Sequence, residues 1–156
     1  MQENLTRKID ALLQEYGESH QNSTNKQIHW IAVPLIYLTV VGFIWSIPKL
    51  IYDINWVWPA LLLALAYYYN LSKPLMVGMG IFTLLCIFIV SNIDSIDGPL
   101  SLFQICLIIF VIAWIFQFIG HKIEGKKPSF LRDIQFLLIG PAWLMSFLMN
   151  KYNIKY

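Results

Sequence analysis

The chain has 156 residues, of which 58% are hydrophobic and only 13% are charged, and its formal net charge is +2. A soluble domain of this length could not bury so much apolar surface, so the composition excludes an ordinary soluble protein. The small net charge gives no indication of nucleic acid as a partner.

Residues 1–19 have the pattern of an amphipathic helix that lies on the membrane surface or packs on the rest of the protein. Its apolar side chains share one stripe at helical spacing, formed by Leu5, Ile9, Leu12, Leu13 and Tyr16. No apolar signal-peptide core is present, so the first span must act as its own insertion signal. Residues 21–25 are rich in turn and capping residues, and the helix is expected to end near His20.

The next helix is expected to begin at Thr24, because Thr24 and Gln27 fit a capping box. Its first turns carry Asn25 and His29 before the apolar run begins, and Pro34 is expected to kink it.

Five blocks of the chain contain no Lys, Arg, Asp or Glu, as bilayer spans do: 30–47, 54–69, 75–90, 101–120 and 134–150. A span needs roughly 20 apolar residues and tolerates about 17, so the second and third blocks are slightly short. The sequence predicts an all-α, polytopic transmembrane helix bundle of about five spans plus the N-terminal amphipathic helix. We expect one integral membrane domain over 1–156, with an interfacial helix and turn at 1–23 and the bundle at 24–150.

The distribution of Lys and Arg favours a cytosolic N-terminus. This orientation puts eight basic residues on the cytosolic side and three on the other. The first set is Arg7, Lys8, Lys26, Lys73, Lys122, Lys126, Lys127 and Arg132, and the second is Lys49, Lys151 and Lys155. All three histidines then lie near the cytosolic face.

The histidines His20, His29 and His121 are the strongest indication of a chemical site. His20 and His29 are nine residues apart, which would place them on opposite sides of an unbroken helix, so the turn between them must bend the chain to bring them together. Asn25 precedes His29 by four residues, and Gln117, His121 and Glu124 share a helix face with spacings of 4 and 3.

Three imidazoles and a possible carboxylate suit non-haem Fe(II) or Zn with open positions for a substrate. The plainer alternative is that interfacial histidines hydrogen-bond to headgroups or backbone. Glu124 could likewise pair with Lys122 or Lys127, and the basic residues 122–132 could be membrane anchors or hold a substrate carboxylate. Cys86 and Cys106 lie inside predicted spans and are expected to be buried free thiols.

Two motifs resemble those of the DUF962 or Mpo1-like family over nearly the whole chain. The first is Tyr16-x3-His20-x4-Asn25-x3-His29, followed by Pro34. The second is Gln117-Phe118-Ile119-Gly120-His121-x2-Glu124-x3-Pro128, followed by Gln135 and by Gly140-Pro141 in the last span.

The resemblance implies an Fe2+-dependent dioxygenase that uses O2 to convert a 2-hydroxy fatty acid to the fatty acid one carbon shorter, without an external reductant. It assigns the iron to His20, His29 and His121. Glu124, Asn25, Gln117 and Tyr16 become candidates for orienting an imidazole or contacting substrate. The compartment would be the cytoplasmic membrane in a bacterium or the endoplasmic reticulum in a eukaryote. The rival functions are a non-catalytic membrane metal carrier or assembly factor, and a Zn-dependent lipid hydrolase.

The predicted topology can be tested with single cysteines. A cysteine at Ser129 should be labelled by an impermeant thiol reagent from the cytosolic side, and one at Asp97 from the other side, because the charge bias places these loops on opposite faces. Reversed labelling would overturn the orientation, and labelling of both from one side would mean that the spans are miscounted.

Overall fold

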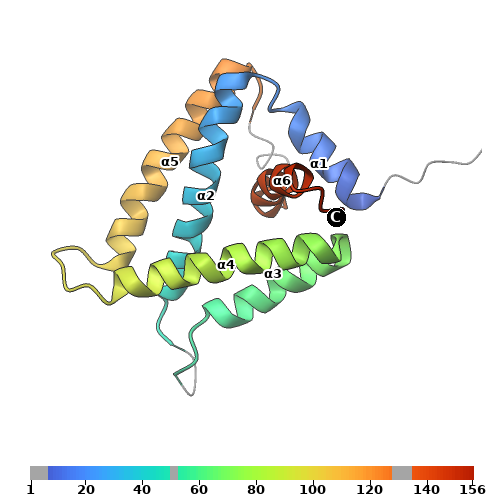
Figure 1. Cartoon of the computed structure of the whole chain (residues 1–156). Helices are drawn as coiled ribbons and strands as arrows, with labels where there is room; N and C mark the ends of the chain where they lie inside the picture. The colour runs from blue at the N-terminus through green and yellow to red at the C-terminus, as the bar shows by residue number, and fades with distance from the viewer. Residues whose placement is uncertain (1–6, 50–52, 128–134) are drawn as a thin grey trace, which may run out of the picture.

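The computed structural model describes residues 7–49, 53–127 and 135–156, and the regular structure in these ranges is entirely helical. The prediction of an all-α fold is therefore confirmed. In the described residues the helices are α1 (Lys8–Glu18), α2 (Ser23–Trp45), α3 (Val57–Leu71), α4 (Lys73–Asp94), α5 (Leu102–Glu124) and α6 (Phe136–Lys151) (Figure 1). The predictions that involve Leu5, Ser129, Pro128, Arg132 and Ile134 concern residues outside these ranges.

Three helices, α2, α4 and α5, are long and apolar enough to cross a membrane, with 23, 22 and 23 residues. At 1.5 Å per residue, 22 residues extend about 33 Å, which matches the hydrocarbon core of a bilayer. The short block 75–90 thus belongs to a full-length helix, because the helix begins at Lys73, capped by Ser72, and continues to Asp94. The blocks 54–69 and 134–150 give the shorter apolar helices α3 and α6, with 15 and 16 residues.

The start of α2 differs from the prediction. The capping residue is Asn22, whose side chain accepts hydrogen bonds from the backbone N–H groups of Thr24 and Asn25, and the helix begins at Ser23. The predicted capping box at Thr24 is wrong, because Asn22 caps the helix and Thr24 already lies inside its first turn. Pro34 lies within a helix that continues without a break to Trp45.

Figure 1 shows how the helices meet. Helices α2 and α5 lie side by side, and the α3–α4 hairpin crosses their lower end. Helix α6 is seen nearly end-on, and α1 lies to its right in the figure and contacts it. The beginning of α2, the end of α5 and the end of α1 converge at the upper corner.

The outward faces of the long helices are apolar. In α5, only 22% of the most apolar 18-residue stretch is buried. Its exposed side chains include Ile108, Ile112, Ile115 and Phe116. Such a surface is unfavourable in water but not in the hydrocarbon of a bilayer. The helices are therefore those of a membrane protein.

Close approach and a few polar bonds hold the long helices together. A Cβ at Gly42 of α2 would overlap the Sγ of Cys106 on α5, so glycine permits this contact. The hydroxyl groups of Tyr37 on α2 and Thr83 on α4 lie 2.7 Å apart and share a hydrogen bond. Cys86 and Cys106 are buried free thiols, as expected.

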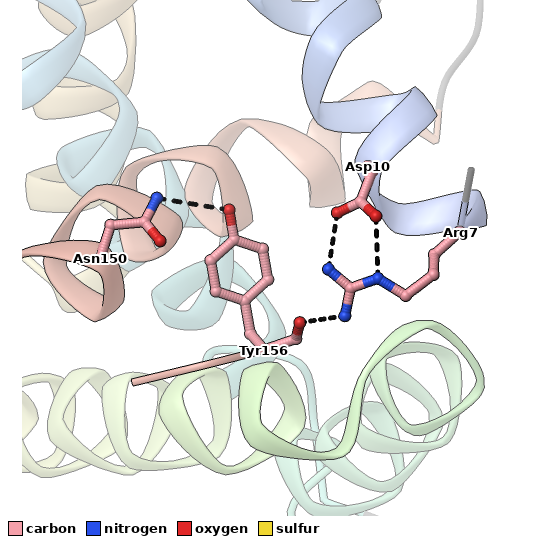
Figure 2. A network of polar contacts seen from close by, with 4 residues as sticks. All are labelled: Arg7, Asp10, Asn150 and Tyr156. Atoms are coloured by element: carbon pink, nitrogen blue, oxygen red, sulfur yellow. Dashed lines mark hydrogen bonds and ion pairs between the residues drawn. The ribbon is translucent and has the colours of Figure 1, made fainter. Parts of the chain in front are cut away.

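The apolar stripe of α1 packs on α6, as one of the two positions considered for this helix requires. Its buried residues are Ile9, Leu12, Leu13 and Tyr16. At the far end of α1, Arg7 forms two hydrogen bonds of 2.8 Å with Asp10 and another with the carbonyl oxygen of Tyr156 (Figure 2). This exposed ion pair adds about 1 kcal/mol at most, so the buried stripe fixes the position of α1.

Candidate metal centre

The three histidines meet at the corner where α1, α2 and α5 converge. His20 follows α1, His29 lies in α2 and His121 lies in α5. Their ring centroids are 4.2 Å (His20 to His29), 5.0 Å (His20 to His121) and 4.9 Å (His29 to His121) apart. One nitrogen of each ring lies within 4.8 Å of one from each of the others. The break between α1 and α2 supplies the bend that the spacing required.

Backbone hydrogen bonds fix the orientation of two of the rings. The Nδ1 atoms of His20 and His29 lie 2.6 and 2.9 Å from the carbonyl oxygens of Tyr16 and Asn25. A carbonyl oxygen can only accept, so each Nδ1 carries the proton and each Nε2 keeps its lone pair. These two Nε2 atoms and the Nδ1 of His121 are buried and have no hydrogen-bond partner.

An aromatic wall surrounds His20, which is fully buried. The ring of Tyr16 stacks on the imidazole at 4.2 Å, and Trp143 of α6 lies 5.2 Å from it. Burial lowers the pKa of His20 from 6.5 to about 4, so the imidazole is neutral at pH 7. Burial also raises the pKa of Tyr16, so its phenol stays protonated.

Glu124 holds the turn that carries His20. Its Oε1 accepts the backbone N–H of Gln21 at 2.8 Å. Its Oε2 accepts the N–H of Asn22 at 2.8 Å and the side-chain amide of Asn25 at 3.0 Å. Backbone carbonyls, rather than this carboxylate, orient the imidazoles of His20 and His29. Glu124 thus joins the end of α5 to the α1–α2 turn.

Two buried side-chain amides beside the histidines also keep unpartnered oxygens, which are Oδ1 of Asn25 and Oε1 of Gln117. A Cβ at Gly120 would overlap the Oδ1 of Asn25, so glycine lets α2 and α5 approach here. Buried polar atoms normally find partners, and a cluster without them indicates a site that binds an ion or ligand.

The donor set fits a divalent transition-metal ion. Three neutral imidazoles with free lone pairs suit iron, zinc, copper or nickel and leave positions for other ligands. Among the described residues, the group of side chains close enough to share an ion consists of the three histidines. The carboxylate of Glu124 lies outside this group and is engaged by N–H donors.

The basic residues near the site have ordinary contacts. The ammonium of Lys126 donates to the carbonyl oxygen of Glu18 at 2.6 Å, while Lys122 and Lys127 are exposed. Within the described ranges, no ion pair joins Glu124 to Lys122 or Lys127, contrary to that alternative.

Sequence reasoning missed the contribution of α6. Trp143 and Phe136 contact Tyr16 at ring distances of 5.4 and 6.0 Å and complete the aromatic wall. An aromatic residue in an apolar helix carries no signal of such a role. The sequence feature nearest to this contact is Gly140. The structure shows that a Cβ added there would lie 2.9 Å from the hydroxyl oxygen of Tyr16.

Comparison with known proteins shows that the chain is similar to one protein family. The family model described as 2-hydroxy-palmitic acid dioxygenase Mpo1-like matches residues 6–152. The 2-hydroxy-palmitic acid dioxygenase MPO1 of Saccharomyces cerevisiae is 30% identical over 133 residues, which cover 83% of this chain and 73% of that protein. No solved structure matches the chain.

Removing any one histidine should abolish tight metal binding. For His20→Ala, His29→Ala and His121→Ala, we expect losses of metal affinity above the roughly 10 to 100-fold typical of a group that only supports a ligand. The measurements are metal content after dialysis and helicity by circular dichroism. Gln27→Ala, an exposed change on the same helix as His29, is the control. Retention of the full metal content by all three histidine variants would disprove the site.

Replacing Glu124 should weaken the site without removing a ligand. In Glu124→Gln one carboxylate oxygen becomes an NH2 group, which cannot accept an N–H hydrogen bond. The α1–α2 turn should therefore loosen, and metal affinity should fall by about 10 to 100-fold. Amide hydrogen exchange at Gln21 and Asn22 should accelerate. Glu15→Gln, the same change at an exposed site on α1, should have neither effect. Unchanged exchange at the turn would contradict this role for Glu124.

Proposed function

The chain belongs to the Mpo1-like family, and we propose that it is an Fe(II)-dependent dioxygenase that shortens 2-hydroxy fatty acids by one carbon. The observation that carries the proposal is the group of three buried imidazoles, each with a nitrogen that lacks a partner. The yeast relative is named for 2-hydroxy-palmitic acid, which suggests the same class of substrate here.

His20, His29 and His121 would hold the iron. When bound, a ferrous ion supplies the redox chemistry that allows O2 to react with an organic substrate. The backbone carbonyls of Tyr16 and Asn25 keep the imidazoles of His20 and His29 in the tautomer that presents Nε2. Burial keeps water away from this corner.

Other polar groups nearby suit the two functional groups of a 2-hydroxy acid. Gln117 is buried, lines a cavity beside His121 and can both donate to a carboxylate and accept from a hydroxyl. The phenol of Tyr16 lines the same cavity and can donate a hydrogen bond. Asn25 differs, because its amide nitrogen already donates to Ser19 and Glu124, which leaves its oxygen as an acceptor.

The electron balance requires no further cofactor. Conversion of a 2-hydroxy acid to carbon dioxide and the acid one carbon shorter releases four electrons. Complete reduction of one O2 molecule takes up four electrons, and its two oxygen atoms end in the products and water. One substrate and one O2 therefore give one shortened acid, one CO2 and one water.

The proposal places the whole chain in the membrane as one domain. Residues from α1, α2, α5 and α6 contribute to one site, which argues against separate units. The N-terminus and the histidines would face the cytosol, as the charge distribution favours. The fatty acid would come from the bilayer, and O2 would reach the site from the bilayer or from the aqueous solution.

Purified protein with Fe(II) and O2 should convert 2-hydroxypalmitate to pentadecanoate without NADPH, because the substrate supplies all the electrons. Palmitate should be inert, since it lacks the 2-hydroxyl group. Product analysis by mass spectrometry and oxygen uptake should give equal amounts of acid formed and O2 consumed. Anaerobic samples, a chelator and His29→Ala are the controls.

Other outcomes point to the rival functions. Shortening of 2-hydroxypalmitate without O2, or only with an added reductase, would contradict the electron balance. Release of a fatty acid from an ester lipid, with no shortening of 2-hydroxypalmitate, would favour a metal-dependent hydrolase. Bound metal with no product across chain lengths would favour a metal carrier.

A further inference from the structure

A cavity of about 190 Å³ lies between α2, α5 and α6, and of the three histidines His121 lines it. Tyr16, Gln117 and His121 line it near the candidate metal centre. Farther along, the lining is almost entirely aliphatic and aromatic, with Val33 and Ile36 on α2 and Phe110 on α5. His121 and Phe110 are eleven residues apart, so this lining extends about 16 Å along α5.

The two parts of the cavity differ in exposure. Gln117 and His121 are 7% and 5% exposed, so the polar part is closed. The most exposed lining residues are Val40 of α2 and Leu137 of α6, at 40% and 42%. The cavity therefore opens between apolar side chains. Val40 lies eleven residues beyond His29, about 16 Å deeper along a helix long enough to cross the membrane.

Gln117 gives the closed part a specific requirement. Its Oε1 is buried without a partner, one helical turn from His121. A buried amide oxygen without a partner is unfavourable, and a ligand that brings a hydroxyl group to it would remove the penalty. The ligand that fits is polar at one end and apolar along the rest.

We propose that this cavity binds the acyl chain of a fatty acid that enters from the bilayer with its carboxyl end first. The carboxyl end lies beside Gln117 and His121, and the chain leaves the protein past Val40. The 2-hydroxy acid as the natural ligand rests on the proposed function, whereas the acyl site itself does not.

This arrangement makes a prediction about selectivity. An acyl chain gains little by moving from the bilayer into an apolar cavity, because both surroundings are hydrocarbon-like. Selection therefore depends on the polar end, and carbons beyond the opening remain in lipid. Long chains should be used about equally well, and an obstruction at Val40 should affect long chains and spare those that end before it.

The binding test uses the metal-free protein in lipid nanodiscs and palmitate that carries a photoreactive diazirine at mid-chain. Labelled peptides should contain lining residues such as Ile36 and Phe110, and 2-hydroxypalmitate should compete. In Val40→Trp the labelling should fall by about tenfold, since a bulky side chain in a filled site is strongly unfavourable. Ile31→Trp is the matched control, because nine residues place Ile31 on the opposite side of α2, where it is 67% exposed.

Turnover provides the second arm. Val40→Trp should slow conversion of 2-hydroxypalmitate by about tenfold and leave that of 2-hydroxyhexanoate unchanged, while Ile31→Trp affects neither. Labelling confined to outward residues such as Ile31, or equal effects of the two tryptophans, would overturn the acyl site. Labelling of the cavity without turnover would refute the dioxygenase and leave the acyl site standing. Turnover without cavity labelling would do the reverse.

Discussion

The carboxylate of Glu124 joins the end of α5 to the turn between α1 and α2, and the candidate metal centre depends on this contact. His20 and His29 can face each other only because the helix is broken between them, and the break exposes backbone N–H groups that need acceptors. Glu124 accepts two of them. The same carboxylate binds Asn25, one turn before His29 on α2. A single side chain thus positions ligands from two segments against His121.

Only part of the cost of burying this polar corner is offset by hydrogen bonds within the protein. The backbone carbonyls of Tyr16 and Asn25 satisfy one nitrogen of each of two imidazoles. The remaining nitrogens, together with the amide oxygens of Asn25 and Gln117, have no partner in the protein. Within a shell formed by Tyr16 and Trp143, such atoms are unfavourable unless an ion and a substrate complete them. The arrangement is accordingly that of a binding site more than of a stable core.

The sequence was informative where polar residues interrupt the apolar blocks. The nine-residue spacing of His20 and His29 with turn residues between them predicted a bend, and helical spacing placed Gln117, His121 and Glu124 on one face. The start of α2 was wrongly predicted at Thr24, because Asn22 and Thr24 are both residue types that cap helices. Only the structure shows that the side chain of Asn22 bonds the N–H groups and that the helix begins at Ser23.

Contacts within the apolar helices could not be predicted in this way. A soluble helix reveals its buried face by alternating polarity, but α6 is apolar on all sides, so nothing marked Trp143 or Phe136 as neighbours of Tyr16. The steep crossing of α3 and α4 over α2 and α5 was hidden for the same reason (Figure 1). Two of the partners of Glu124 are backbone N–H groups, which no side-chain pattern specifies.

In the proposed site, three imidazoles from separate segments share one iron ion. X-ray absorption at the iron edge, on protein loaded with Fe(II) and freed of excess metal, tests it most directly. We expect one iron per chain, with a shell of nitrogen and oxygen ligands and the outer scattering of about three imidazole rings. An iron that dissociates during removal of excess metal, or a shell without imidazole scattering, would contradict it.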